Sequence, residues 1–153
     1  MYLIIVVCGI AGTLLMTAFV YSIASIKNKK WKVIRLLGTM VCNEILPNGN
    51  LSASKKVLFT GTVLHYAIGV LFAFLYHLLW SRNIGEPSLL SALIFGIING
   101  CIGAFGWAIY FQLHKNPPTI SLKKFLLLIG SSHIFFAIGF VESFRLAINI
   151  YKG

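Results

Sequence analysis

Charge is the scarcest property of this sequence. Charged residues make up 10% of the 153 residues, whereas a soluble domain normally carries about 25%. Hydrophobic residues make up 58%, and the mean hydropathy is +0.88. So few charges cannot cover a water-facing surface, which excludes an ordinary soluble enzyme, a disordered chain and a coiled coil. The composition is typical of a protein that spans a bilayer.

Acidic residues and cysteines are also few. Glu44, Glu86 and Glu142 are the only carboxylate side chains, and aspartate is absent. Catalysis by paired carboxylates and oxygen-ligated cation sites are therefore poorly supplied. The three cysteines form no CxxC or CxxCH motif, which argues against a disulfide framework and covalently attached haem. No nucleophile elbow, metalloprotease motif, phosphate loop or nucleotide fingerprint occurs, so nothing in the sequence indicates an enzyme.

Four apolar stretches are long enough to cross a bilayer, which needs about 20 residues. They cover approximately residues 2–26, 57–80, 89–114 and 125–150. The sequence therefore predicts an all-α fold, an integral membrane four-helix transmembrane bundle that forms a single domain over residues 1–153. The first stretch has an alternative as a signal peptide cleaved near Ser22-Ile23-Ala24. Against this, no cation precedes the stretch, and it exceeds the usual apolar core of about 7–15 residues.

The positive charges predict an orientation. Ten lysines and arginines lie in the first and third connections, whereas only Arg82 and Lys152 lie in the second connection and the C-terminal segment. Cytoplasmic loops carry the excess of cations, so we expect both termini to be extracytoplasmic. The net charge of +10 is also compatible with nucleic-acid binding, but these cations lie between apolar stretches. The expected partner is the lipid bilayer and not nucleic acid.

Residues 31–46, in the first connection, carry apolar side chains at helical spacing. This pattern predicts one amphipathic helix on the cytoplasmic leaflet. We expect the cations beside and within it to contact anionic lipid, namely Lys27, Lys29, Lys30, Lys32 and Arg35. The same pattern also fits a helix packed under the bundle.

The second and fourth stretches begin alike, which suggests an internal repeat. Each has two lysines, eight further residues and then a histidine, giving Lys55-Lys56 with His65 and Lys123-Lys124 with His133. The predicted directions of the spans make this a parallel repeat about an axis along the membrane normal. Chance similarity is the alternative, because few positions match.

His65 and His133 are the candidate intramembrane polar site. Each lies nine residues beyond its second lysine, or about 13 Å along a helix, so the two imidazoles share one depth. Such a pair can relay protons or hold a haem iron axially, and the identity of any metal stays open because a third ligand is missing. The structural alternative is that each donates to a backbone carbonyl or to a nearby hydroxyl such as Thr17, Ser131 or Ser132.

Glu142 and Arg145 form a secondary candidate near the outer end of the fourth stretch. Their i, i+3 spacing predicts an exposed intrahelical ion pair. The functional alternative adds His77, at a similar depth, to form an outward-facing proton or cation site.

Glycines mark the third stretch as a packing helix. Gly96, Gly100, Gly103 and Gly106 lie along it, and small residues let membrane helices approach closely. We therefore expect the third stretch to be the centre of the bundle. Asn99, beside these glycines, is expected to make an interhelical contact.

Several short strings carry a family resemblance: Arg35–Thr39 (RLLGT), His65–Val70, Leu89–Gly96 (LLSALIFG) and Phe136–Gly139. On these, the chain resembles an uncharacterised family of small bacterial four-helix inner-membrane proteins, a domain of unknown function. The resemblance implies a membrane location and a four-helix bundle, and it implies no activity. The segment 27–32 carries more positive charge here than that family leads us to expect.

Three functional hypotheses follow. The first is a non-enzymatic accessory or scaffold protein that acts through partners, as a homo-oligomer or in a larger membrane complex. The second is a small oligomeric transporter or ion-conducting protein that uses His65 and His133. The third is a redox membrane protein in which the same two histidines bind haem.

Overall fold

The computed structural model describes residues 1–27 and 29–152. Its elements in order are α1 (Tyr2–Lys27), the short 3-10 helix η1 (Lys29–Trp31), α2 (Val33–Val41), α3 (Lys55–Ser81), α4 (Leu89–Leu113) and α5 (Leu122–Lys152). Apart from one isolated β-bridge between Ile45 and Leu51, these described residues form no strand pairing. The prediction of an all-α fold is confirmed.

Four helices, α1, α3, α4 and α5, are long and apolar enough to cross a membrane. Their ends lie within three residues of the predicted ones. Hydroxyl side chains fix two of the starts, because Ser54 accepts from the Val57 backbone N–H and Ser88 accepts from that of Ser91. The apolar runs thus define the four long helices locally, and polar caps set the starts of α3 and α4.

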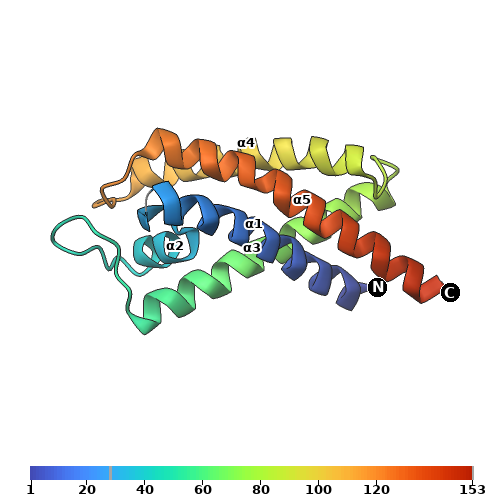
Figure 1. Cartoon of the computed structure of the whole chain (residues 1–153), viewed down its shortest axis with the longest axis horizontal. Coiled ribbons are helices and arrows are strands. Elements are labelled where there is room, and N and C mark those ends of the chain that lie inside the picture. The colour runs from blue at the N-terminus through green and yellow to red at the C-terminus, as the bar shows by residue number, and fades with distance from the viewer. Residues whose placement is uncertain (28, 153) are drawn as a thin grey trace.

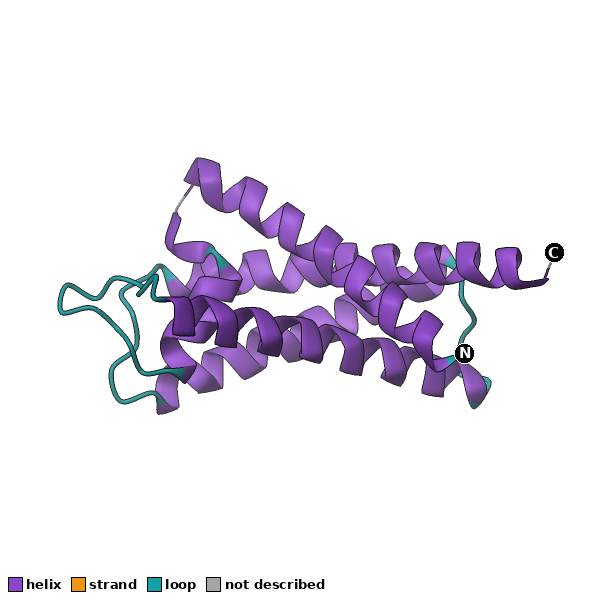
Figure 2. Ribbon diagram, turned by 90° about the horizontal axis from the view of Figure 1, so that it is seen from below, coloured by secondary structure: helices purple, strands orange, loops and turns teal. Residues whose placement is uncertain are grey.

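The long helices form an open arrangement rather than a closed ring. α5 packs along both α4 and α1, and α1 also packs on α3, whereas α3 and α4 make few mutual contacts. Figure 1 shows α3 and α4 joined at the end that holds both termini and diverging toward the other end. We call these the terminal end and the basic end. Figure 2 shows the longer loops gathered at the basic end.

The most buried helix is α5, and the expectation that the third stretch is central is wrong. In the most apolar part of α5, 50% of the residues are buried, against 33% in α4. α5 lies between two neighbours and buries Phe125, Phe136 and Phe140. The glycines of α4 give it one close partner, and its opposite side stays exposed.

The predicted helix over 31–46 is shorter in the structure, where α2 covers Val33–Val41. Asn43 adopts a positive φ of 53°, and the Asn43 and Glu44 N–H groups donate to the carbonyls of Met40 and Thr39. This pattern is a Schellman motif, which ends a helix before the apolar pattern ends. α2 packs on the start of α3, where Gly38 and Gly61 let the two backbones touch.

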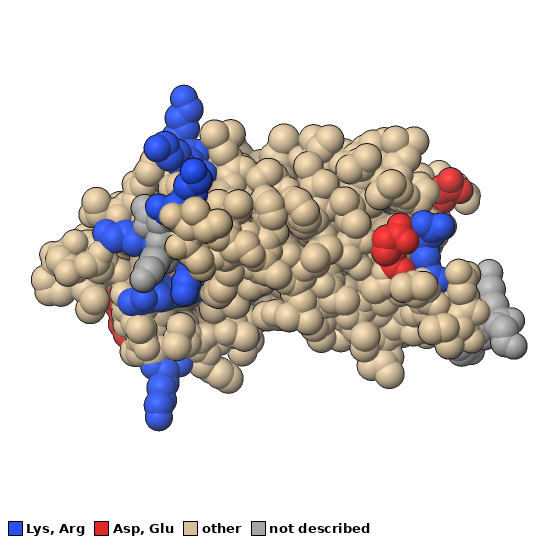
Figure 3. Space-filling view, viewed as in Figure 1, with Lys and Arg blue, Asp and Glu red and all other residues tan. Residues whose placement is uncertain are grey.

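The cations gather at the basic end (Figure 3). This end holds the C-terminal ends of α1 and α4, the N-terminal ends of α3 and α5, and α2. The terminal end carries Arg82 and Arg145 among the cations whose side chains are described. The charge separation seen in the sequence is therefore also a separation in space.

The internal repeat gains no support from the packing. In such a repeat, α4 corresponds to α1 and α5 corresponds to α3. The contact between α1 and α5 should then have a counterpart between α4 and α3. α1 packs extensively on α5, but α4 does not pack in this way on α3.

Candidate functional site

His65 and His133 line one cavity of about 350 Å³. The four long helices and α2 all contribute to its wall. Both histidines are 8% exposed, and most of the other lining side chains are apolar or aromatic. The two histidines that the sequence predicts at one depth thus line a shared space.

The hydrogen bonds of His65 fix its neutral tautomer. The Thr17 hydroxyl donates its only proton to the Thr13 carbonyl over 2.6 Å. The 2.9 Å contact between Thr17 Oγ1 and His65 Nε2 must therefore be donated by the imidazole. Neutral His65 carries its proton on Nε2, which leaves Nδ1 as an acceptor.

His133 takes the opposite tautomer. Its Nδ1 lies 2.8 Å from the Ile129 carbonyl, which can only accept, so the proton is on Nδ1. Nε2 is left as an acceptor. It faces Gly103 of α4, where an added Cβ would lie 2.9 Å from this nitrogen. The absence of a side chain at Gly103 keeps room at this edge of the ring.

These contacts match the structural alternative for the two histidines, with Thr17 as the hydroxyl for His65. The other two candidate hydroxyls act within their own helix: Ser131 donates to Leu128 and Ser132 donates to Ile129. Each imidazole therefore has one nitrogen fixed by the protein and one nitrogen without a partner among the described residues.

Contacts between helices lie on both sides of the cavity along the bundle. Toward the terminal end, Asn99 of α4 donates to the Tyr76 hydroxyl of α3 over 2.9 Å, and the rings of Tyr76 and Phe95 lie 4.9 Å apart. Toward the basic end, α2 packs on α3, and the His114 imidazole at the end of α4 contacts the Met40 carbonyl at 3.0 Å. Between these contacts, α3 and α4 remain separate.

The cavity's exposed lining belongs to α3 and α4. Ile68 is 45% exposed, and Gly106 is exposed with no atom within 4 Å of a Cβ added to it. The opening therefore lies sideways, between the two helices. Ile68 is twelve residues beyond Lys56, or about 18 Å along α3.

The four glycines of α4 do not share one role. A Cβ on Gly96 or Gly100 would meet the α5 backbone, at Ile134 or Gly130, and one on Gly103 would meet the His133 ring. These three positions face α5. Gly106 instead opens into the cavity.

The two histidines do not fit an axially ligated haem. Thr17 occupies Nε2 of His65, and the remaining Nδ1 is adjacent to the ring carbon that carries the side chain. The Cβ of His65 therefore crowds any planar macrocycle at Nδ1. No group of three or more His, Cys, Asp or Glu side chains is close enough to hold a metal ion within the described part of the chain.

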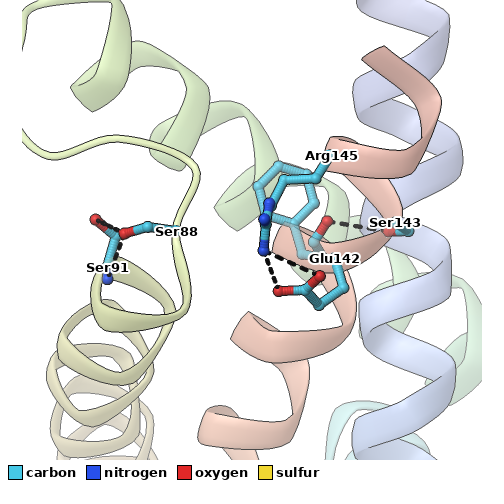
Figure 4. Close-up of polar contacts among 6 residues, drawn as sticks. Ser88, Ser91, Glu142, Ser143 and Arg145 are labelled. Carbon is cyan, nitrogen blue, oxygen red and sulfur yellow. Dashed lines mark hydrogen bonds and ion pairs between the residues drawn. The ribbon is translucent and has the colours of Figure 1, made fainter. Parts of the chain in front are cut away.

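The secondary site is an ion pair at the surface. Arg145 Nη1 lies 2.9 Å from Glu142 Oε1, and both side chains are about half exposed (Figure 4). His77 lies near Phe144, with ring centroids 6.0 Å apart, and lines an open depression with Arg145. Glu142 does not line this depression. The three residues are thus neighbours without forming one polar cluster.

Several of the cations expected to contact lipid also make contacts within the chain. Arg35 donates to the backbone carbonyls of Leu51 and Ser52, and Lys30 donates to that of Thr119. Lys32 lies over the Tyr21 ring at 5.6 Å. Lys27 is exposed at the end of α1, and the Lys29 side chain lies outside the described residues. The basic segment is therefore partly a structural strap.

Comparisons of the chain with protein-family models, with curated proteins and with solved structures each give no match. The function must therefore be argued from the site itself.

Two parts of the site were missed in the sequence. Tyr76 was not singled out, because an aromatic residue in an apolar span gives no signal that it will meet Asn99. The pairing of Gly38 with Gly61 was not predicted either, although glycines within two adjoining helices are a usable signal of close approach.

Proposed function

We propose that this chain is a four-span integral membrane protein that binds a small lipophilic molecule in the cavity beside His65 and His133. The observation that carries the proposal is the sideways opening of that cavity between α3 and α4. Pockets that bind small ligands are typically apolar with a few polar groups that fix orientation, and they range from about 300 to 1,000 Å³. A molecule dissolved in the bilayer reaches this opening directly.

The charge distribution supports the orientation of the protein in the membrane. The basic end lies in the cytoplasm, and both termini lie on the other side, because cations accumulate at one end of the bundle (Figure 3). In this arrangement α2 lies at the cytoplasmic surface, and the exposed Lys27 side chain meets anionic lipid. Cysteines introduced singly at exposed Asn48 and at exposed Asn83 test this orientation. An impermeant thiol reagent applied from outside intact cells should label only Asn83→Cys.

The scaffold hypothesis loses one of its supports. It drew on small-residue surfaces for binding partners, but Gly96 and Gly100 are used against α5 within the chain. The transporter hypothesis needs a path across the bundle, whereas the contact of Tyr76 with Asn99 lies on one side of the cavity and α2 lies on the other. Both hypotheses stay predictions, and a bound lipophilic ligand is compatible with either as an added role.

Native mass spectrometry tests the binding function. The whole chain is purified gently from its own membranes, as wild type, as Gly106→Leu and as Ala67→Leu. A Cβ on Gly106 meets no atom within 4 Å, so we expect Gly106→Leu to occupy the cavity, whereas Ala67→Leu adds the same side chain at an exposed position of α3. We expect a small lipophilic adduct on wild type and on Ala67→Leu, and its loss from Gly106→Leu. The same set of adducts on all three proteins would refute the proposal.

A further inference from the structure

We infer that the ligand of this cavity carries a hydroxylated aromatic ring, as a hydroquinone on an apolar tail does, and that it binds in preference to the corresponding quinone. This inference rests on the proposed binding function and specifies the chemistry of its ligand.

Two imidazole nitrogens beside the cavity are free to accept a hydrogen bond. His65 Nδ1 and His133 Nε2 have no hydrogen-bond partner in the described chain. Among the described residues, the polar side-chain atoms that are both fully enclosed and without a partner are Trp31 Nε1 and Trp80 Nε1. The two imidazole nitrogens are not in this group, so they have some accessible surface. Both belong to side chains that line the cavity.

Both free nitrogens are acceptors and not donors. Thr17 and the Ile129 carbonyl hold the two protons on the opposite ring atoms. Each free nitrogen is therefore an acceptor that needs a donor, and an unpaired acceptor in an apolar site is costly. A ligand with hydroxyl groups supplies the donors. A ketone, a quinone or an acyl chain supplies none.

The size and lining of the cavity suit one aromatic ring. Its volume of about 350 Å³ is near the lower limit for ligand pockets, so it suits a single ring with its substituents. Phe72, Trp107 and Phe136 line it, and such side chains pack well on a planar ring. The opening toward the apolar layer, beside Ile68 and Gly106, leaves a path for the tail.

The test uses 2-decylhydroquinone and 2-decyl-1,4-benzoquinone as a matched pair of probes. The full chain, labelled with ¹⁵N-histidine, is placed in lipid nanodiscs and studied by NMR, with resonances assigned through single His→Gln variants. Without a probe, His65 should show the Nε2–H tautomer and His133 the Nδ1–H tautomer. Two histidines with the same tautomer would overturn the inference.

We expect the hydroquinone to shift the unprotonated nitrogens of both His65 and His133 in a saturable manner. Two new hydrogen bonds imply roughly 5- to 150-fold tighter binding than that of the benzoquinone. His114, outside the cavity, should not respond and serves as the internal control. Equal or tighter binding of the benzoquinone would overturn the inference while leaving the binding function intact. If neither probe binds saturably and wild type carries no adduct lost from Gly106→Leu, the binding function fails as well.

A pair of threonine variants tests the origin of the preference. Thr17→Val removes the acceptor that holds the His65 proton on Nε2, so the preference for the hydroquinone should fall. Thr62→Val, at an exposed position of α3, should leave it unchanged. An unchanged preference in Thr17→Val would overturn the role assigned to the fixed tautomer.

Discussion

The two halves of the bundle solve the same packing problem differently. In the terminal half, α3 and α4 meet through a buried aromatic cluster. Tyr76 lies at its centre, 4.9 Å from the ring of Phe95 and 5.6 Å from that of Phe140, and bonds to Asn99. In the basic half the same two helices diverge, and the space between them becomes the cavity beside His65.

Glycines along one helix can have different structural roles. Gly100 lets α4 touch the α5 backbone at Gly130, whereas Gly106, six residues later, leaves open space. In a membrane, where lipid is as apolar as the side chains, helices hold together where backbones come close or polar groups pair. Both halves have such contacts: Tyr76 pairs with Asn99 in the terminal half, and Gly38 of α2 lies against the α3 backbone in the basic half.

Paired glycine variants should show the largest effect. Gly100→Ala should lower the free energy of unfolding by about 2–3 kcal/mol, since its Cβ meets a backbone carbonyl that cannot move aside. Gly106→Ala should be neutral or stabilising by up to about 1 kcal/mol, because nothing obstructs it and alanine favours helix. Unfolding by SDS titration measures both. Equal destabilisation would remove the distinction between the two halves.

Tyr76→Phe should show a smaller effect on the terminal half. It keeps the aromatic packing but leaves the buried Asn99 amide without its acceptor, which should cost about 1 kcal/mol. The same titration measures this loss, with Tyr66→Phe as a control in the same helix. A loss no greater than that of Tyr66→Phe would mean that ring packing alone joins α3 and α4 here.

The connection between α2 and α3, in the basic half, should depend on pH through Glu44. Its carboxylate accepts from Ser54 over 2.7 Å and from Ser52 over 3.2 Å, and Lys56 lies 3.8 Å away. The Ser54 hydrogen bond is the main cause that lowers the pKa of Glu44, with smaller help from Ser52 and Lys56. Because the folded pKa is the lower one, the stabilisation is complete above the unfolded value of about 4.3 and is lost as the pH falls through the folded pKa.

Thermal unfolding of wild type and Glu44→Gln between pH 7 and pH 3 checks this. The wild type should have the higher Tm at pH 7, and the difference should shrink below about pH 4.3. A difference that stays constant down to pH 3 would show that the carboxylate charge does not stabilise the connection between α2 and α3.

The smallest effect should come from the exposed ion pair of the terminal half. Glu142→Gln removes the charge that pairs with Arg145, and exposed i, i+3 pairs contribute about 0.5 kcal/mol or less. SDS titration should therefore place this variant close to wild type. A loss above about 1 kcal/mol would indicate that the pair lies in a far less polar environment than its exposure implies.

Much of the fold was predictable because it is encoded locally. The four long helices follow from apolar runs between polar caps such as Ser54 and Ser88. The limit of local reasoning appears at α2, where the apolar pattern runs to 46 but Asn43 ends the helix through its positive φ. A periodic pattern does not report a backbone angle.

Length, charge and spacing along the chain account for the helices, for the cations at one end, and for the equal distance of His65 and His133 from their lysine pairs. That these histidines share a cavity follows from the packing of the helices, since a position along a helix does not specify which way a side chain faces. The packing also decides which nitrogen of each ring is free, because Thr17 reaches His65 from another helix. The binding proposal depends on those contacts between distant segments.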